Sequence, residues 1–338
     1  MLYIYQFPDW TSFRFDTKSV LDALGKTRFC EGRLDGILDI CGNRNFENGL
    51  LVKDICENFA IDGFAINEKD VNTEVCLKAQ GSTAHIKNYL GAIANSNTPL
   101  THERLINWHN ALVSVKAHSY RTSSSKTTDE RTGLQYQGPE PERLYGEMEN
   151  FLNWFENSGM DGTIKAAIAH FWFITLRPFS EGNGRLARAI TAMQLCRSRH
   201  SSHIQYALNA QINERREEYL RILNRTQCGN GDITEWILWF LGLIDKAAKT
   251  SIALLEHKLK QFRFQERHSG VSTSEREQAI IEAVLSGTIP HEFSAKDVAT
   301  LFDTSHDTAL REIQSLIAKG LLRASAKGGR SQRYSVVE

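Results

Sequence analysis

The sequence has few cysteines and few prolines, and it has no long hydrophobic run. Its six cysteines are scattered without any Cys-x-x-Cys pair, which argues against a zinc knuckle or a disulfide framework and favours a reducing compartment. No apolar run reaches the roughly 18 residues of a membrane span, so we expect no membrane association. Because the opening MLYIYQFPDW lacks a basic segment followed by an apolar one, we expect no signal peptide and a cytoplasmic protein.

An excess of charge of one sign is also absent. The chain carries 40 Lys and Arg residues and 40 Asp and Glu residues, so any contact with a polyanion must come from a local patch. Six prolines among 338 residues leave room for long helices, and stretches rich in Leu, Ala, Glu and Arg indicate a mostly helical protein. At roughly 100–200 residues per domain, this length predicts two or three domains.

Changes in composition and periodicity divide the chain into four parts. Residues 1–95 and residues 96–260 have the patterns of two helical domains. Residues 261–276 are polar and resemble a linker, and residues 277–338 follow a different pattern that predicts a separate small domain.

Three segments of the second domain are informative. Residues 163–176 are apolar on almost every side, which predicts a helix buried in the middle of a bundle. Residues 120–138 are polar and rich in Ser and Thr, which predicts a mobile loop ending in a short hairpin strand around residues 134–136. A last helix is expected from Ile233 to Leu259.

Residues 277–338 predict three helices followed by a two-stranded hairpin, the plan of a winged helix-turn-helix. Ser294 and Ser305 are the expected N-caps of the second and third helices. Between residues 319 and 333 the sequence has five basic residues and no acidic one. Contact with DNA is one interpretation of this basic wing, and dimerisation or contact with another protein is the alternative. The candidate DNA-binding residues are Arg311, Lys319, Lys327, Arg330 and Arg333.

The most informative stretch is RPFSEGNGRLAR at residues 177–188. A proline ends the apolar helix, and Gly182 and Gly184 permit positive φ angles, so that backbone N–H groups can turn inward at the start of the next helix. Arg185 and Arg188 lie three residues apart and therefore share a face of that helix. The sum is an anion site suited to a polyphosphate, beside which Glu181 is placed to help hold Mg²⁺.

This string resembles the signature of the Fic family, His-Pro-Phe-x-(Asp/Glu)-Gly-Asn-Gly-Arg-x-x-Arg, and differs from it at the first position. The resemblance implies an all-α core in which ATP lies over the loop with Mg²⁺. It also implies transfer of AMP to a Ser, Thr or Tyr hydroxyl of a protein target. Phe179 would pack below the loop and Glu181 would assist the metal. The phosphate-binding residues implied by the resemblance are Gly182, Asn183, Gly184, Arg185 and Arg188.

The resemblance extends beyond the motif and covers most of the chain. The segment GLQYQGPEPERLYGEMENFLNWF resembles the family's β-hairpin flap and the helix after it, which implies that a target segment docks there by strand addition. The flap residues concerned are Leu134, Gln135 and Tyr136. The segment INERREEYLRILNRTQ resembles the part of the family that closes the adenine pocket. It implies nucleotide contacts from Tyr219, Leu220 and Gln227.

Arg177 stands where the family has its general base, a histidine. A base must lose its proton near the working pH, which histidine does near pH 6.5 whereas arginine stays protonated above about pH 12. General-base help is typically worth about 10²–10⁴ in rate, so we expect a strongly impaired transferase. Arg177 could instead bind phosphate or an acidic side chain, or simply lie solvated at the helix end.

Residues 58–63, NFAIDG, lie where related proteins carry an inhibitory motif, Ser/Thr-x-x-x-Glu-Gly/Asn. In the family that Glu pairs with the second arginine of the signature and blocks productive ATP binding. Here Asn58 replaces Ser/Thr and Asp62 replaces Glu, and because Asp is one methylene shorter we expect a weaker clamp. The alternative is that Asp62 and Gly63 form only a turn.

The sequence therefore predicts an all-α Fic core with a short β-hairpin flap, an N-terminal helical domain and a C-terminal winged helix-turn-helix. The favoured function is a protein adenylyltransferase scaffold that uses ATP and Mg²⁺ and is impaired at Arg177. The alternatives are a catalytically silent nucleotide-binding pseudoenzyme and a DNA-binding regulator. A homodimer is compatible with the sequence.

Overall fold

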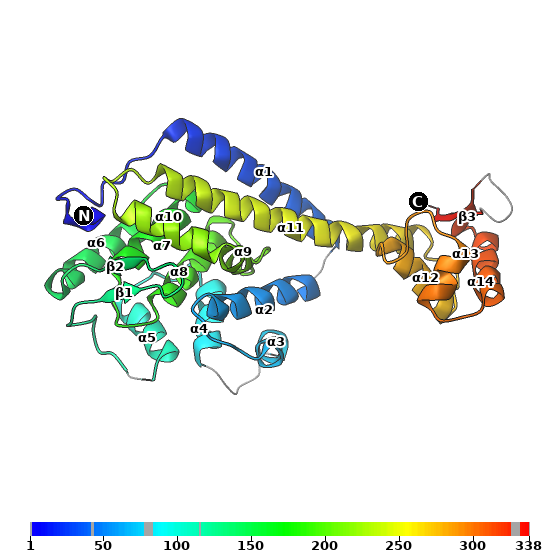
Figure 1. The fold of residues 1–338 in the computed structure, drawn as a ribbon, viewed down its shortest axis with the longest axis horizontal. Coiled ribbons are helices and arrows are strands. Elements are labelled where there is room, and N and C mark those ends of the chain that lie inside the picture. Colours follow the sequence, from blue (N-terminus) through cyan, green and yellow to red (C-terminus); the bar gives the residue numbers. More distant parts are fainter. Residues whose placement is uncertain (1, 42–43, 78–83, 115, 326–331, 338) are drawn as a thin grey trace. The chain divides into compact units, whose positions relative to one another are not determined.

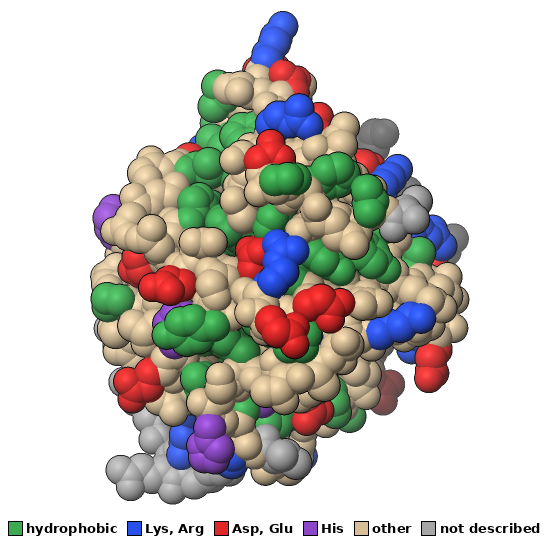
Figure 2. Space-filling model, turned by 90° about the vertical axis from the view of Figure 1, so that its left-hand side faces the viewer, with side chains coloured by type: hydrophobic (Ala, Val, Ile, Leu, Met, Phe, Trp, Pro, Cys, Tyr) green, Lys and Arg blue, Asp and Glu red, His purple; other side chains and the backbone are tan. Residues whose placement is uncertain are grey.

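The computed structural model describes residues 2–41, 44–77, 84–114, 116–325 and 332–337, and it is mostly helical, as the sequence predicted (Figure 1). The chain forms two compact units, one of Met1–Asp35 with Asn43–Ser251 and one of Gly36–Gly42 with Ile252–Glu338. In the described ranges, no helix combines the length and the apolar character needed to cross a membrane. On the face drawn in Figure 2, acidic and basic side chains are scattered among hydrophobic and neutral ones, in keeping with the zero net charge.

The N-terminal part of the chain is built from a short 3-10 turn and four helices. These elements are η1 (Ile4–Gln6), α1 (Thr17–Cys41), α2 (Arg44–Ala60), α3 (Glu68–Leu77) and α4 (Ala84–Ala94). Helix α2 packs against α3 and α9 (Leu208–Glu214), and α4 packs against α8 (Asn183–Ser198). These contacts bring the C-terminal end of α2 close to the start of α8.

The rest of the larger unit is a helical bundle with one small hairpin. Its elements are α5 (His102–Leu112), β1 (Lys126–Thr128), β2 (Gln135–Gln137), η2 (Pro141–Arg143), α6 (Leu144–Asn157), α7 (Gly162–Leu176), α8, α9, α10 (Arg216–Gln227) and the part of α11 (Thr234–Arg267) up to Ser251. Strands β1 and β2 are antiparallel, with Thr127 opposite Tyr136. The expected strand around residues 134–136 is therefore confirmed, one residue later along the chain.

Helix α7 is the centre of this bundle (Figure 1). The Asp161 side chain caps its start by accepting hydrogen bonds from the N–H groups of Thr163 and Ile164. Every residue from Thr163 to Leu176 is buried, as expected for a helix that is apolar on all sides. Helices α6 and α8 pack against it, and Trp236 of α11 donates a hydrogen bond to the carbonyl of Ala167 at 2.8 Å. This packing fixes the end of α7, where the signature begins.

The predicted linker is partly helical. Helix α11 continues to Arg267, past the expected end at Leu259, so residues 261–267 of the expected linker belong to a helix. The polar residues of this stretch include Lys, Gln, Arg and Glu, which are good helix formers, and their polarity was mistaken for that of a loop. Phe264 is buried in the core of the smaller unit, which gives this part of the helix an apolar contact.

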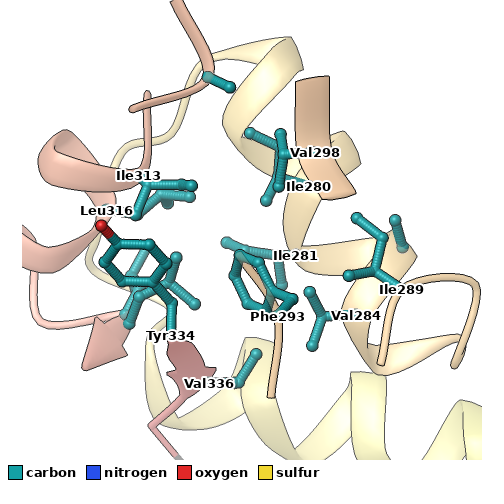
Figure 3. Packing of buried hydrophobic residues seen from close by; sticks show 14 of the residues in the cluster. Ile280, Ile281, Val284, Ile289, Phe293, Val298, Ile313, Leu316, Tyr334 and Val336 are labelled. Atoms are coloured by element: carbon teal, nitrogen blue, oxygen red, sulfur yellow. The ribbon is translucent and has the colours of Figure 1, made fainter. Parts of the chain in front are cut away.

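The smaller unit has three helices and a hairpin in the order that the sequence predicted. They are α12 (Glu275–Leu285), α13 (Ala295–Leu301), α14 (His306–Ala318), β3 (Leu322–Ala324) and β4 (Tyr334–Val336). Ser294 and Ser305 cap α13 and α14 as expected, each accepting from the N–H group three residues later. Figure 3 shows the core that these elements share, in which side chains of α12, α14 and β4 converge on Phe293.

One carboxylate fastens α12 to α14. Glu277 is almost fully buried, and it accepts hydrogen bonds from Lys319 Nζ at 2.6 and 2.8 Å and from Ser315 Oγ at 2.7 Å. Although burial alone would raise it, these hydrogen bonds and that from the Ser274 N–H lower the pKa of Glu277 from 4.5 to about 2. The ionised carboxylate therefore stabilises the folded unit, and this contribution is complete above pH 4.5 and lost as the pH falls towards 2.

Replacing Glu277 with Gln should weaken the smaller unit by about 2 kcal/mol at pH 7, because hydrogen bonds to a charged group become neutral ones and Lys319 loses its partner. Amide hydrogen exchange of residues 275–325 in the full chain measures this as faster opening. The control is Glu282→Gln, a change at an exposed carboxylate on the same helix, which should leave exchange unchanged. Equal protection in Glu277→Gln and wild type would contradict the assignment.

Candidate functional site

The turn between α7 and α8 has the backbone form that the sequence predicted. Arg177 ends α7 in the left-handed region, with φ of 46°, and its N–H donates to the carbonyl of Phe173. Gly182, with φ of 77°, is the N-cap of α8. Gly184, which would also permit a positive φ, lies in the first turn of α8 without one. Its lack of a side chain matters because Arg188 and Asp62 pack close to it.

Asn183 shapes this turn from within. Its Oδ1 accepts from the Phe179 N–H at 3.0 Å, and its Nδ2 donates to the Phe179 carbonyl at 2.8 Å. The Phe179 ring is buried and stacks on His109, with centroids 4.1 Å apart. The side chain of Asn183 is thus used to close the loop, and Phe179 anchors it below, as the resemblance implied for Phe179.

Arg121 holds the loop to the flap, and sequence reasoning did not identify it. Its Nε donates to the Arg177 carbonyl at 2.8 Å, its Nη1 to the Ser123 carbonyl at 2.8 Å and its Nη2 to the Pro139 carbonyl at 2.6 Å. The backbone N–H of Arg121 also donates to the carbonyl of Pro178 at 2.9 Å. One buried guanidinium therefore joins both ends of the flap segment to the start of the signature.

The two arginines of the signature meet the end of α2. Arg188 Nη2 lies 2.9 Å from Asp62 Oδ2 and donates to the Asn58 carbonyl at 2.8 Å, while its Nε donates to Asn58 Oδ1. Arg185 Nε lies 3.5 Å from the same Asp62 oxygen, and its guanidinium lies over the Phe64 ring. Both arginine side chains are buried. The Asp62 carboxylate thus lies between the two cations, at the N-terminal end of α8, where a helix favours negative charge.

Gly184 leaves the space that this arrangement needs. A Cβ atom there would lie 3.1 Å from Arg188 Nη1 and 3.2 Å from Asp62 Oδ1. Asp62 itself is presented by a turn that ends α2: the Phe64 N–H donates to the Phe59 carbonyl, the Gly63 N–H donates to the Ala60 carbonyl, and Gly63 has φ of 82°. This is a Schellman motif with glycine at C′. Asp62 and Gly63 therefore form a turn, and the Asp62 carboxylate also forms an ion pair with Arg188.

A cavity of about 310 Å³ opens beside this ion pair. It is lined by the end of α2, both strands of the flap, the end of α7, the start of α8 and the inner face of α10. The residues singled out from the sequence that line it are Asp62, Leu134, Gln135, Tyr136, Arg177, Gly184, Arg188, Tyr219, Leu220 and Gln227. Segments far apart in the sequence are thus brought to one site.

The far wall of the cavity is held by a chain of buried hydrogen bonds. Thr191 Oγ1 donates its proton to the Ala187 carbonyl, so it must accept the hydrogen bond from His170 Nδ1 at 3.0 Å. The other ring nitrogen, His170 Nε2, then accepts from the Tyr219 hydroxyl, also at 3.0 Å. Burial, and secondly the charge of Arg188, lowers the pKa of His170 to about 3, so the imidazole is neutral. Gln227 Nε2 donates to Thr175 Oγ1 at 3.2 Å. These bonds fix the positions of Tyr219 and Gln227.

Comparison with known proteins identifies a family domain in this part of the chain. Residues 99–195 match the model of the Fic/DOC family. The chain contains a Fic/DOC family domain. Residues 3–78 match a second family model, described as a domain of unknown function (DUF4172). Proteins with a Fic domain are generally linked to transfer of AMP or another nucleoside monophosphate, from a nucleoside triphosphate and with a metal ion.

Solved Fic structures resemble this chain. A Fic family protein from Desulfovibrio desulfuricans G20 is 17% identical over 95% of this chain and 97% of its own, with a TM-score of 0.62, which shows a shared fold. A Fic-domain signalling protein from Bacteroides thetaiotaomicron is 17% identical over 70% of this chain and 95% of its own, with a TM-score of 0.47. Fic-1 from C. elegans is 16% identical, covering 70% and 73%, with a TM-score of 0.47.

The flap of the Fic domain has one edge turned away from β1. Hydrogen bonds from Asp129 N–H to the Leu134 carbonyl and from Gly138 N–H to the Ser125 carbonyl bracket the hairpin, so by alternation the backbone groups of Gln135 point to the open edge. Asn224 Nδ2 of α10 donates to that outward Gln135 carbonyl at 3.0 Å. A target strand that docks there must therefore replace a contact made within the chain.

Arg216 joins the flap to the end of α2, and sequence reasoning missed it too. Its Nη2 donates to Asp129 Oδ2 at 2.7 Å, and its Nε donates to the carbonyl of Ile61 at 2.8 Å. Although burial raises it, the hydrogen bonds from Arg216 and Thr132 lower the pKa of Asp129 to about 2. The contact joins two parts of the cavity lining, the flap and the residues that follow α2.

Glu181 is exposed on the loop of the Fic domain, just before Gly182. In the described ranges no group of three or more His, Cys, Asp or Glu side chains is arranged to hold a metal ion. Mg²⁺ usually takes one or two carboxylates and completes its shell with phosphate oxygens and water. A single exposed carboxylate beside an anion site fits that mode of binding.

Two of the five basic residues expected to bind DNA are paired with carboxylates of the same unit. Lys319 is paired with Glu277, and Arg333 Nη1 lies 3.4 Å from Asp297 Oδ2. Arg311 is exposed and lies 4.0 Å from Glu312. Lys327 and Arg330 lie outside the described residues.

The Arg121 contact makes a direct prediction about Gly138. A Cβ at Gly138 would lie 2.9 Å from Arg121 Nη2 and 3.3 Å from the Leu176 carbonyl, so Gly138→Ala should destabilise the larger unit by about 1–3 kcal/mol. Denaturant unfolding followed by fluorescence measures this, because all six tryptophans lie in that unit. The matched control is Gly146→Ala on α6, where a Cβ meets nothing within 4 Å and should stabilise by about 0.5–1 kcal/mol. Equal stability of the two variants would refute the role of Arg121.

Proposed function

We propose that this protein is a nucleotide-binding member of the Fic family whose AMP transfer to a protein hydroxyl is impaired by Arg177. The observation that carries the proposal is the cavity, where Arg177 at the end of α7 lies near the turn and the arginines that we propose to bind phosphate. The turn at Gly182, the two buried arginines and the neutral wall of Tyr219 and Gln227 are all in place. The residues that we propose to hold a nucleotide are thus different from the residue at position 177, which would activate the target hydroxyl.

The phosphate groups of ATP are expected at the start of α8. Backbone N–H groups there, the positive end of the helix, and the guanidinium groups of Arg185 and Arg188 all favour anions. The base is expected between Tyr219, Leu220 and Gln227, which line the other side of the cavity. Mg²⁺, when bound through Glu181 and the phosphates, would offset charge on the leaving pyrophosphate.

This chain is poorly equipped to activate the target hydroxyl, because that step requires removal of the hydroxyl proton. In AMP transfer the hydroxyl oxygen attacks the α-phosphorus, its bond to phosphorus forms, and the bond to pyrophosphate breaks. The hydroxyl proton needs an acceptor, and an arginine guanidinium, which stays protonated above about pH 12, cannot serve as that base. The protein target itself would dock along the open edge of β2, in place of the Asn224 contact.

The ion pair of Asp62 supports an inhibitory role for residues 58–63. Any phosphate that binds Arg188 must compete with Asp62 Oδ2 and with both oxygens of Asn58. The shorter Asp was expected to clamp weakly, yet its carboxylate reaches both arginines because the turn at Gly63 brings it over Gly184. We therefore propose that Asp62 acts as a substitute anion, which a nucleotide displaces on binding.

Replacing Arg177 with His should restore a proton acceptor and raise AMP transfer by about 10²–10⁴ over the wild-type chain. The measurement is labelling of the protein itself and of lysate proteins with radioactive ATP and Mg²⁺. Robust labelling by wild type would contradict impairment. No labelling by Arg177→His, although ATP binds, would favour the silent nucleotide-binding alternative.

Replacing Asp62 with Asn should tighten ATP binding about 10-fold, because a competing carboxylate is removed from Arg185 and Arg188. Isothermal titration calorimetry measures the change. The matched control is Asp70→Asn, an exposed carboxylate on α3. Unchanged or weaker binding in Asp62→Asn would contradict competition for the arginines.

For residues 275–337 we propose a winged helix-turn-helix, supported by the order of three helices and an antiparallel hairpin around one core. DNA binding is not part of the proposed function. Lys319 and Arg333 are paired with carboxylates within the same unit, which reduces the free positive charge available for phosphate contacts.

A further inference from the structure

Arg177 is a half-buried cation with a neutral partner. Its Nε donates to Ser125 Oγ at 3.0 Å, and within the described part of the chain no carboxylate lies at ion-pair distance from it. Burial lowers the pKa of Arg177, while Tyr136 and the more distant charge of Asp62 act in the opposite direction. A buried charge without a counter-ion is costly, so its side chain is suited to an anionic ligand.

The charges around the cavity are unbalanced, although the chain as a whole is neutral. Among the residues that line the cavity, Arg216 is paired with Asp129, which leaves Asp62 opposite Arg177 and Arg188. The lining therefore carries one excess positive charge, and Arg185, which lies beside Asp62 outside the lining, adds a second. If the ligand displaces Asp62, it meets three. This count favours a ligand with several negative charges at one end.

The position of Arg177 relative to Ser125 matters for what it can bind. The hydrogen bond through Nε fixes the plane of the guanidinium, and its two terminal nitrogens make no hydrogen bond to the described residues. A guanidinium held in this way presents two parallel N–H groups, which match two oxygens of a phosphate group. The side chain is therefore built as an anion receptor and is not simply a solvated end of a helix.

We infer that Arg177 is a third phosphate-binding arginine, which makes this cavity select a nucleoside triphosphate or diphosphate over a monophosphate. The inference rests on the proposed function, because it assigns a role to Arg177 within the same nucleotide site. According to this inference, arginine in place of histidine at position 177 both removes the base and adds a contact to the nucleotide. Arg177 therefore strengthens nucleotide binding while it prevents AMP transfer.

The test is calorimetry of the full chain with ATP, ADP and AMP, in wild type and in Arg177→Gln, Arg177→Lys and Arg177→His. Gln should weaken ATP binding about 10- to 100-fold and AMP binding much less, since one charge-assisted contact to phosphate is lost. Lys should recover most of the affinity, because it keeps the charge. The control is Arg221→Gln, which removes one exposed charge from α10 outside the cavity lining.

The His variant adds a second readout. Its affinity for ATP, divided by that of wild type at the same pH, should be several-fold higher at pH 5.5 than at pH 8, because the imidazole gains its charge below about pH 6.5. The charged and titratable groups that face position 177 are Arg121, Tyr136 and Asp62. Because ATP and these three groups are the same in both proteins, dividing the affinity of the His variant by that of wild type removes their contribution to the pH dependence.

Two failures are distinguishable. If ATP binds wild type but Arg177→Gln binds it equally well, the inference is overturned and the proposed function stands; this is also the outcome expected if Arg177 instead serves an acidic side chain of a target. If neither wild type nor Asp62→Asn binds ATP, the proposed function itself is overturned. Thermal unfolding of each variant shows whether a loss of binding reflects loss of fold.

Discussion

The contact on which this site depends is the Asp62 carboxylate held between Arg185 and Arg188 at the start of α8. Two buried guanidinium groups at the positive end of a helix would be unfavourable alone, and this carboxylate offsets them. It comes from the turn that follows α2, so the N-terminal part of the chain supplies the carboxylate that pairs with two arginines of the Fic domain. In the function that we propose, a nucleotide that binds this site must therefore compete with Asp62 for the two arginines.

The rest of the architecture keeps that competition in place. Asn183 closes the loop, Arg121 fastens it to both ends of the flap, and Arg216 joins the flap to the end of α2. Where the family signature has a histidine, which can exchange a proton near neutral pH, this chain has a permanent cation at position 177. Nucleotide binding and transfer are thereby uncoupled in our account, since the first gains a contact where the second loses its base.

Much of this could be predicted from the sequence because the signals were local. The apolar character of residues 163–176 predicted the buried helix α7, and the glycine-containing loop predicted the turn at Gly182. Residues that act over long sequence distances could not be found in this way. Arg121 bonds to backbone carbonyls, which carry no residue-specific signal, and two of them, at Pro139 and Arg177, are distant in the chain. Arg216 bonds to one carbonyl and to the Asp129 carboxylate, both far away in the chain. The reach of Asp62 depended on the turn at Gly63 and not on side-chain length, and the helical end of α11 depended on the buried Phe264.

The most direct test of the account is a crystal structure grown with excess ATP and Mg²⁺. It should show the phosphate groups within hydrogen-bond distance of Arg185 and Arg188, with Arg177 on a further phosphate oxygen and the Asp62 carboxylate displaced from Arg188. A structure in which Asp62 still lies 2.9 Å from Arg188 while the cavity holds no nucleotide would contradict it.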